Sequence, residues 1–519
     1  MKNLILKIVY YYTAIITLTF VIQGCQKENN INEYISLFQF TQKDNSGILI
    51  NDVNCEIRNN RISAYIPHTV ENKKLIPTIS FNAKHIYING KVFENGKTAI
   101  DLSKPAKILI IGHDGEKAEG VICVNAYTGI PIINIYTEDK EDIVSKEEYK
   151  KAFFQLMTYD NDCNVNILHE SDIKLRCRGN GTYTFKEKLP YRIKFKSPTS
   201  LLGFPPHRDY VLLANAFDFT LLKNNIATFI GNLSKLDYTP QGQFIELFLN
   251  GVHKGTYQIY EKIEVGSNRV NIQKNDFLLK IDANVNKKHK SLKVNTINSP
   301  IMILEPKDIN DKDIEYIIEY FNKTITSIYG NHFKDINNGY TKYIDIMSFI
   351  DWYIINEIAH NNDACFYKSC YMQLARGKKL KMGPIWDFDT SFGWKVFDSY
   401  KYDEESYKEM YVINTTWYRR LFEDKSFAEK VYERYLHFYK HKSDIIENID
   451  YNYNYLRYSI KEMNNIWFER DYEQLTHDEI LQLYKDEVQE LKNYVSKRMV
   501  FLKLELENIS KFGYIPKSI

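Results

Sequence analysis

The apolar pattern of this chain changes character twice, and this change most constrains the folds that the chain can adopt. From about residue 35 to residue 136, short alternating runs are separated by turns such as Asn89-Gly90 and Asp114-Gly115. Alternation with a period of two, broken by turns at this spacing, predicts an all-β domain, here a small sandwich. A mixed α/β region follows, and from about residue 415 the apolar period is helical. Because 519 residues exceed what one hydrophobic core usually supports, we expect two or three domains.

The mixed region contains three strong local signals. Residues 191–196, YRIKFK, alternate apolar with basic side chains and therefore predict a strand with one apolar face. Asn250-Gly251 lies between two apolar runs, which is the pattern of a tight β-hairpin. Residues 345–360 begin with Asp345, a good helix N-cap, and repeat apolar residues at helical spacing, so we expect a helix that ends near His360.

The C-terminal part is predicted to be helical throughout. The runs SFAE (426–429) and THDE (476–479) match the capping box that starts many helices. Six apolar residues then share one helical face: Leu481, Tyr484, Val488, Leu491, Val495 and Leu502. A stripe of this kind indicates core packing rather than a cofactor site.

The N-terminus has the pattern of a targeting segment. Lys2 and Lys7 precede an apolar run from Ile8 to Ile22, and Gly24 stands directly before Cys25. This resembles a bacterial lipoprotein signal, in which the cysteine is acylated and becomes the first residue of the mature chain. An uncleaved membrane anchor is the alternative, but the run is short for a span.

The resulting domain prediction has four parts: a signal peptide over 1–25, a polar tether over 26–35, a β-sandwich over 36–135, and a mixed α/β region over 136–519. The last of these is expected to be helical from about residue 401. We expect a lipid-anchored protein in the periplasm or at the cell surface, as in the outer membrane of Bacteroidetes. Six further cysteines are compatible with either disulfides or buried free thiols in such a location.

Composition and missing motifs exclude several function classes. The net charge of +2 gives no electrostatic reason to bind nucleic acid. Hydrophobic residues make up 44% and charged residues 26%, which is typical of a globular protein. The chain has no GxxxxGK[ST], HExxH, GxSxG or GxGxxG motif, so common nucleotide-loop, hydrolase and dinucleotide chemistries lose their support.

The run GPIWDFDT, residues 383–390, places Asp387 and Asp389 among apolar residues. In an extended segment, residues i and i+2 point to the same side, so the two carboxylates would converge and repel each other. Oxygen ligands of this kind suit a hard cation such as Mg²⁺. A buried arginine partner is the alternative explanation.

A larger pattern resembles the spore coat protein H (CotH) kinase-like family. It runs in order through RCRGNGTYTFKEKLPYRIKF, LLGFPPHRDYVLLANAFDFTLLKNNIA, FIELFLNGVHKGTYQIYEKIEVGSNRVNI, FIDWYIINEIAHNNDACFYKSCYM and KLKMGPIWDFDTSFGW. The resemblance implies an α+β, atypical protein-kinase-like domain that transfers phosphate from ATP to serine or threonine of surface proteins. It also implies ATP with Mg²⁺ or Mn²⁺ as cofactors.

The resemblance further implies a role for individual residues. Asp363 matches the catalytic aspartate of the family, and Asp387 matches its metal-binding aspartate. Asp389 takes the second acidic position of that motif. Nucleotide contacts are expected from Lys188, Glu261, Lys194 and Arg178, with Glu261 as a candidate partner for Lys188. The family usually has a second lysine where this chain has Leu189.

Two hypotheses remain open at this stage. The first is an exported, ATP-dependent protein kinase tethered to the membrane by lipid on Cys25. The second is a surface binding protein or adhesin that uses the same fold without catalysis. The presence of both Asp363 and Asp387 favours the enzyme, because an adhesin has no physical need for this acidic pair.

Overall fold

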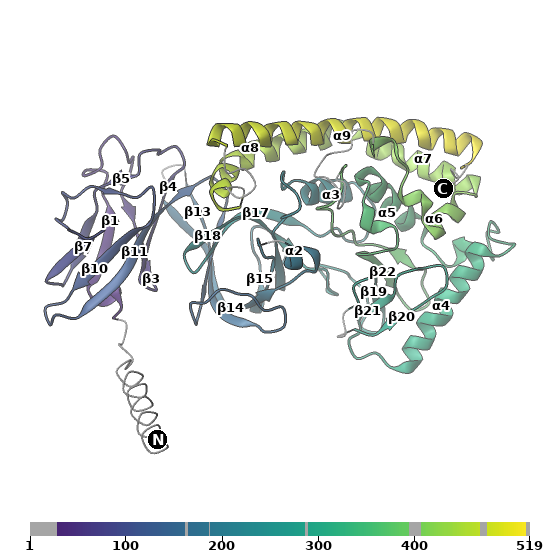
Figure 1. The fold of residues 1–519 in the computed structure, drawn as a ribbon. Helices are drawn as coiled ribbons and strands as arrows, with labels where there is room; N and C mark the ends of the chain where they lie inside the picture. The colour runs from purple at the N-terminus through teal and green to yellow at the C-terminus, as the bar shows by residue number, and fades with distance from the viewer. Residues whose placement is uncertain are drawn as a thin grey trace, which may run out of the picture. The chain divides into compact units, whose positions relative to one another are not determined.

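The computed structural model describes residues 29–160, 164–185, 187–285, 289–393, 406–467 and 475–514 (Figure 1). The predicted signal peptide with Cys25, and also Cys163, lie outside these residues. The described chain forms two compact units. The first contains the residues up to Tyr127 with Tyr159–Val165, and the second contains Thr128–Thr158 and the remainder from Asn166.

The first unit consists of β-sheets around one apolar core. A three-stranded sheet has the order β2-β1-β6, a six-stranded sheet has the order β3-β4-β11-β10-β7-β8, and β5 pairs with β9. Phe38 of β1 and Ile108 of β10 belong to the same buried cluster, so both larger sheets contribute to this core. The strands are β1 (Ile35–Phe40), β2 (Val53–Asn54), β3 (Glu56–Arg58), β4 (Arg61–Pro67), β5 (Lys74–Leu75), β6 (Thr78–Phe81), β7 (His85–Ile88), β8 (Lys91–Val92), β9 (Ile100–Asp101), β10 (Ala106–Ile111) and β11 (Lys117–Tyr127).

The predicted turns and most predicted strands of this unit are found at their expected places. Asn89 and Gly90 join β7 to β8 with φ of 49° and 77°, as a tight primed turn requires. The run ILINDV, residues 48–53, is one of the alternating runs that predict a strand, and this prediction is wrong except at the last residue, Val53. There the Asp52 carboxylate accepts the backbone N–H of Gln42, so local side-chain hydrogen bonding replaces strand pairing.

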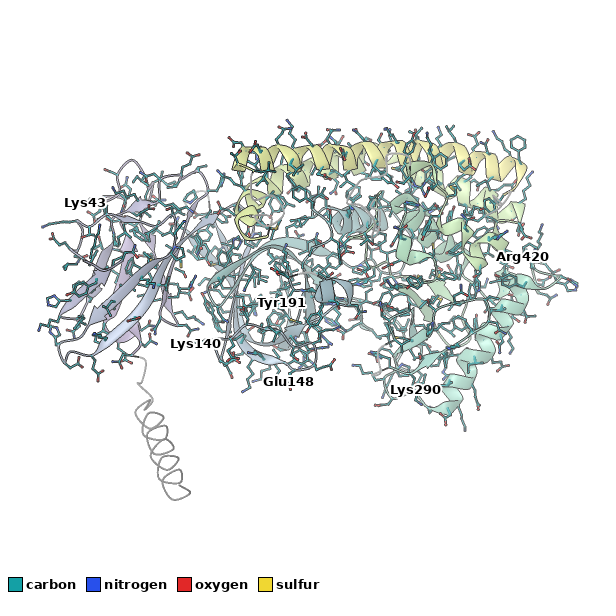
Figure 2. All side chains as sticks on the ribbon, viewed as in Figure 1. Lys43, Lys140, Glu148, Tyr191, Lys290 and Arg420 are labelled. Atoms are coloured by element: carbon teal, nitrogen blue, oxygen red, sulfur yellow. The ribbon has the colours of Figure 1, made fainter. Side chains whose placement is uncertain are left out.

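The second unit begins with a closed barrel in the order β12-β13-β14-β15-β16-β18-β17, which the sequence did not predict. Apolar side chains fill its interior, Tyr191 among them (Figure 2). The predicted domain boundary after residue 135 falls inside β12, which pairs with both β13 and β17. The strands are β12 (Ile132–Thr137), β13 (Lys150–Tyr159), β14 (Val165–Cys177), β15 (Tyr191–Thr199), β16 (His207–Leu213), β17 (Gly242–Leu249) and β18 (Val252–Glu261).

Both strand predictions in the barrel are confirmed. In β15, Tyr191, Ile193 and Phe195 are buried, whereas the alternate residues Arg192 and Lys194 are only half-buried. The two residues Asn250 and Gly251 form the turn between β17 and β18, with φ of 51° and 76°. A short helix, α2 (Gly181–Phe185), follows β14, and α3 (Lys223–Asn232) lies between β16 and β17.

A five-stranded sheet with flanking helices follows the barrel. Its order is β20-β21-β19-β22-β23. The predicted helix is confirmed as α5, because the Asp345 side chain accepts the N–H of Ser348 and His360 ends the helix in the left-handed conformation. Residues 348–359 are all buried, so α5 is a central core helix. The elements are β19 (Phe277–Ile281), β20 (Ser291–Leu292), β21 (Ile301–Glu305), α4 (Asp311–Tyr329), α5 (Ile346–Ala359), β22 (Cys370–Leu374) and β23 (Lys381–Met382).

The C-terminal part is helical, as predicted, with α6 (Thr416–Leu421), α7 (Lys425–Lys440), α8 (Lys442–Trp467) and α9 (His477–Phe512). Helix α9 packs against α7 and α8, and α8 packs on β18 (Figure 1). The Thr476 capping box is present. The predicted capping box that begins at Ser426 is wrong, because Asp424 is the N-cap of α7 and accepts the N–H of Ser426. Within the described residues, no helix is both long enough and apolar enough to cross a membrane.

Candidate active site

Aspartates from four separate segments of the second unit gather near the carboxyl end of α5. Asp363 lies in a 3₁₀ turn (Asn362–Ala364) directly after α5. Asp387 and Asp389 follow β23, Asp282 follows β19, and Asp218 precedes α3. Their charges act on one another, since Asp387, Asp218 and Asp363 all raise the pKa of Asp389. The fold therefore brings together residues that are up to 171 positions apart in sequence (389 − 218).

The segment that carries Asp387 is held by hydrogen bonds from three elements. Ser369 Oγ donates to Asp387 Oδ2 at 3.0 Å, and Asn361 Nδ2 donates to the Asp387 carbonyl oxygen at 3.4 Å. The Phe388 N–H donates to Asn224 Oδ1 on α3 at 3.0 Å. Asp387 has φ of 73°, so the segment is not extended there, in contrast to the prediction. Such left-handed residues persist only where their surroundings fix them, which is common at functional sites.

Burial and mutual repulsion perturb two of these carboxyl groups strongly. Burial, and next the charge of Asp387, raise the pKa of Asp389 to about 8. Burial also raises the pKa of Asp363 to about 6, again with a contribution from Asp387. Because each carboxylate disfavours the ionised form of its neighbour, a bound cation would stabilise the cluster.

Four cationic side chains surround the aspartates. Lys280 Nζ lies 2.5 Å from Asp282 Oδ2, and Lys368 Nζ lies 3.8 Å from Asp363 Oδ1. Burial lowers the pKa of the Lys223 ammonium, whereas Asp218 and Asp389 raise it.

Arg178 is the fourth cation and comes from the barrel. Burial lowers the pKa of its guanidinium, whereas the charges of Asp387 and Asp389 raise it. The guanidinium carbon lies 5.6 Å from the centre of the Trp386 ring. Within the predicted nucleotide set, Arg178 is in electrostatic contact with Asp387 and Asp389, and Lys188 is in electrostatic contact with Asp218.

Lys188 does not form the predicted pair with Glu261. Lys188 is buried, and its Nζ donates to the Thr256 carbonyl oxygen at 2.5 Å and lies 3.4 Å from the Met463 sulfur of α8. Burial lowers the pKa of this ammonium to about 7. The side chain therefore packs between the barrel and α8.

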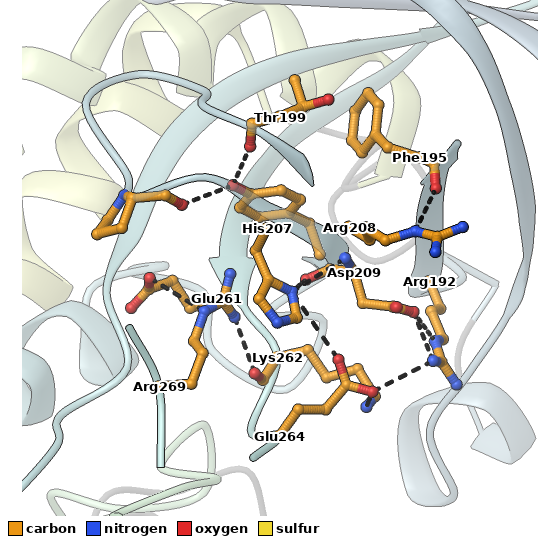
Figure 3. Close-up of polar contacts among 12 residues, drawn as sticks. Arg192, Phe195, Thr199, His207, Arg208, Asp209, Glu261, Lys262, Glu264 and Arg269 are labelled. Atoms are coloured by element: carbon orange, nitrogen blue, oxygen red, sulfur yellow. Dashed lines mark hydrogen bonds and ion pairs between the residues drawn. The ribbon is translucent and has the colours of Figure 1, made fainter. Parts of the chain in front are cut away.

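Glu261 belongs to a different polar network, at one end of the barrel (Figure 3). Its Oε1 lies 3.3 Å from Arg269 Nε, and its Oε2 accepts from the Tyr238 hydroxyl at 3.0 Å. Lys194 lies half-buried on β15, in register with Asp209 of β16. The prediction placed Lys188, Glu261 and Lys194 together, and the structure separates them because strand register and burial, rather than sequence order, decide their partners.

The carboxylate oxygens near Asp387 suit a cation that also binds water and substrate phosphates. Among the described residues, no three His, Cys, Asp or Glu side chains form a ready metal cage. Mg²⁺ is usually held by one or two carboxylates together with water and substrate phosphates. Asp387 and Asp389 can supply such a pair, and the surrounding cations suit phosphate oxygens.

Sequence reasoning missed Lys280, Asp282, Asp218 and Lys223. One signal was available for the first two. The run FLLKID, 277–282, is an apolar strand that ends in a lysine and an aspartate, and polar residues at the end of a buried strand are often functional. No comparable signal marks Asp218 and Lys223, since both also serve the start of α3, where the Lys223 N–H donates to Asp218 Oδ2 at 2.9 Å.

Comparison with known proteins gives one informative result. No match was found among curated proteins. A solved structure from Bacteroides thetaiotaomicron, described as a candidate glycoside hydrolase, is 13% identical over 31% of this chain and 51% of its own length. Its TM-score of 0.16 is too low to support any argument. The model of the family described as "CotH kinase protein" matches residues 175–502, a span that includes the whole acidic cluster, and this chain therefore belongs to the CotH kinase family.

Proposed function

We propose that this protein is an exported, lipid-anchored, atypical protein kinase that transfers the γ-phosphoryl group of ATP to serine or threonine hydroxyls of surface or secreted proteins. The observation that carries this proposal is the meeting of Asp363, Asp387 and Asp389 in one cluster, where burial and mutual repulsion raise the pKa of Asp363 and Asp389. Membership of the CotH kinase family supports it.

The nucleotide phosphates bind beside the aspartates, between the barrel and the five-stranded sheet. Asp387 and Asp389 hold the divalent cation, with Ser369 fixing the orientation of Asp387. When bound, Mg²⁺ or Mn²⁺ supplies charge neutralisation of the phosphate oxygens. Arg178, Lys280 and Lys368 complete this neutralisation, and they replace Lys188 in that role.

Asp363 acts on the acceptor hydroxyl. The hydroxyl oxygen forms a bond to the γ-phosphorus, the bond from this phosphorus to the β–γ bridging oxygen breaks, and ADP leaves with that electron pair. Asp363 accepts the hydroxyl proton and returns it to solvent. A carboxyl group whose pKa is raised to about 6 is a better proton acceptor than an ordinary aspartate and is still largely ionised near pH 7.

Two matched substitutions test these roles. Asp387→Asn removes a ligand charge and should weaken Mg²⁺-ATP binding by about tenfold or more. Asp363→Asn should change that affinity by no more than about threefold, because the residue faces the acceptor, yet both variants should lose phosphate transfer. Asp237→Asn, at an exposed ion pair with Lys381, is the control and should leave both properties unchanged.

Calorimetric titration with Mg²⁺-ATP and a labelling assay with γ-labelled ATP provide the two measurements. If the wild-type protein neither binds Mg²⁺-ATP or Mn²⁺-ATP nor labels itself or any added protein, the kinase proposal fails. The alternative, a binding protein or adhesin on the same fold, would then be favoured.

A further inference from the structure

A pocket of about 320 Å³ lies beside Asp363 and has no role in the proposed nucleotide site. Three segments form its wall: Thr296 and Asn298 before β21, Cys365 and Phe366 directly after the turn that carries Asp363, and residues 411 and 414–416. This volume is at the lower end of the range of about 300–1,000 Å³ for ligand pockets. It is therefore suited to one large side chain or a short piece of an extended chain.

The pocket adjoins the turn that carries Asp363, because Cys365 and Phe366 of its wall follow Asp363 by two and three residues. The charges of Asp387 and Asp389 raise the pKa of Arg178, which directly follows β14 of the barrel. Burial raises the pKa of the Tyr411 hydroxyl in the pocket wall, and the charges of Cys365 and then Asp363 raise it further. Asp363 is thus in electrostatic contact with the pocket wall, whereas Arg178 is in electrostatic contact with the other two aspartates of the site.

The lining chemistry excludes phosphate and favours an uncharged side chain. Among the described residues that line the pocket, none is charged and none belongs to the barrel. Phosphate groups are usually held by Arg or Lys side chains, and the described wall contains neither. The wall instead combines hydroxyl and amide groups with the aromatic rings of Phe366 and Tyr411.

Two further observations indicate a built site. Thr415 lines the pocket and is 7% exposed, and its hydroxyl has no hydrogen-bond partner among the described residues. A buried, unpaired hydroxyl costs free energy unless a ligand satisfies it. In addition, Thr296 and Phe366 have φ of 71° and 53°, which is unfavourable for a β-branched or bulky residue and is typical of ligand clamps.

We infer that this pocket binds an uncharged residue of the acceptor polypeptide, close in sequence to the serine or threonine that receives the phosphate. This inference rests on the proposed kinase function. The Thr415 hydroxyl supplies a hydrogen bond to the bound residue, and the two aromatic rings cover its apolar part. An acidic residue at the same place is disfavoured, because Asp363 lies close by and the wall carries no cation to compensate it.

The test uses the full chain, Mg²⁺-ATP and a set of serine peptides in which each flanking position is varied among Asn, Tyr, Lys and Asp. Thr416→Trp fills the pocket mouth from an exposed position, and Arg419→Trp places the same side chain on the exposed face of the same helix, α6. We expect Thr416→Trp to raise KM for the preferred peptide about tenfold or more, with Mg²⁺-ATP affinity and ATP hydrolysis by water unchanged. Arg419→Trp should match the wild type.

A second variant distinguishes a loss of peptide binding from a folding defect. Thr415→Val keeps the shape of the side chain and should raise the peptide KM by about three- to tenfold, the loss expected for one hydrogen bond. It should also weaken discrimination between Asn and Asp at one flanking position.

The possible outcomes distinguish a failure of the pocket assignment from a failure of the kinase proposal. Unchanged peptide KM in both variants of an active enzyme would overturn the pocket assignment and leave the kinase proposal standing. Loss of Mg²⁺-ATP affinity in Thr416→Trp, or competition of adenosine with the peptide, would reassign the pocket to the nucleotide and overturn the inference. A wild-type protein that binds no Mg²⁺-ATP and transfers no phosphate would overturn the kinase and the acceptor pocket together.

Discussion

Replacing Arg498 of α9 with methionine should strongly destabilise the second unit. Arg498 and Glu357 of α5 are 0% and 1% exposed at their side chains, and Arg498 Nη2 lies 2.8 Å from Glu357 Oε1. The guanidinium also donates to the Glu357 carbonyl oxygen and to the carbonyl oxygens of Tyr407 and Glu409. Methionine fills a similar volume but leaves the carboxylate buried without its counter-charge.

The expected cost follows from that unpaired charge. Removing one partner of a buried ion pair typically costs about 3–5 kcal/mol of unfolding free energy. The Glu357 carboxylate keeps hydrogen bonds from the N–H groups of Tyr411 and Ile413, at 2.7 and 3.0 Å, so we expect a value near the lower end, about 3 kcal/mol. The double variant Arg498→Met, Glu357→Gln removes both charges and should be more stable than Arg498→Met by about 1 kcal/mol or more.

Guanidinium unfolding followed by tryptophan fluorescence provides the assay, because the tryptophans at described positions, Trp352, Trp386, Trp417 and Trp467, lie in the second unit. Arg457→Met, at an exposed position on α8, is the control and should change the unfolding free energy by less than about 0.5 kcal/mol. If Arg498→Met stays within about 1 kcal/mol of the wild type, or if the double variant is the less stable one, the buried-charge reasoning is refuted.

Three further predictions concern the site and the N-terminus. Calorimetry should show that Lys280→Met weakens Mg²⁺-ATP binding about tenfold or more, whereas Lys188→Met changes the affinity less than about threefold. A larger loss of affinity in Lys188→Met than in Lys280→Met would restore the family-based assignment of Lys188. The folded state raises the pKa of Asp389 to about 8, so the folded chain binds a proton that the unfolded chain releases near pH 4. In EDTA, lowering the pH from 8 to 6 should therefore stabilise the wild type relative to Asp389→Asn. At pH 8, Asp389→Asn should be the more stable protein. Urea unfolding measures this, and an identical pH dependence of the two proteins would contradict it. Cys25→Ser should release the protein from the membrane fraction or block its processing, and unchanged retention with normal processing would count against lipidation.

Local signals in the sequence predicted local structure well because each depends on a few neighbouring residues. Asn250-Gly251 forms its turn, Asp345 caps α5, and Thr476 starts α9. At the start of α7 two caps compete within three residues, and Asp424 accepts the N–H of Ser426, so the helix begins earlier than the capping box suggested.

Long-range pairing was not predictable from the same signals. The barrel closes because β12 pairs in parallel with β17, so that Ile132 lies opposite Glu246, more than a hundred residues away. Nothing in the alternation of either strand specifies that partner. Lys188 shows the same limit for the site, because the family resemblance implies a phosphate ligand, whereas the packing of α8 against β18 buries it.

Helix α9 supplies none of the five aspartates of the acidic cluster, although its Glu487 is in electrostatic contact with Asp218 and Lys223. The site also depends on α9 through Arg498. Asp387, Ser369 and Phe366 hold φ of 73°, 54° and 53°, left-handed conformations that are unfavourable for these residues and are kept only by surrounding contacts. The Arg498 guanidinium fixes the C-terminal turn of α5 through Glu357, and Glu357 in turn fixes the segment that begins at Tyr411. Phe366 follows that turn and lines one pocket together with Tyr411, so the same buried ion pair that stabilises the fold also supports the wall of the pocket.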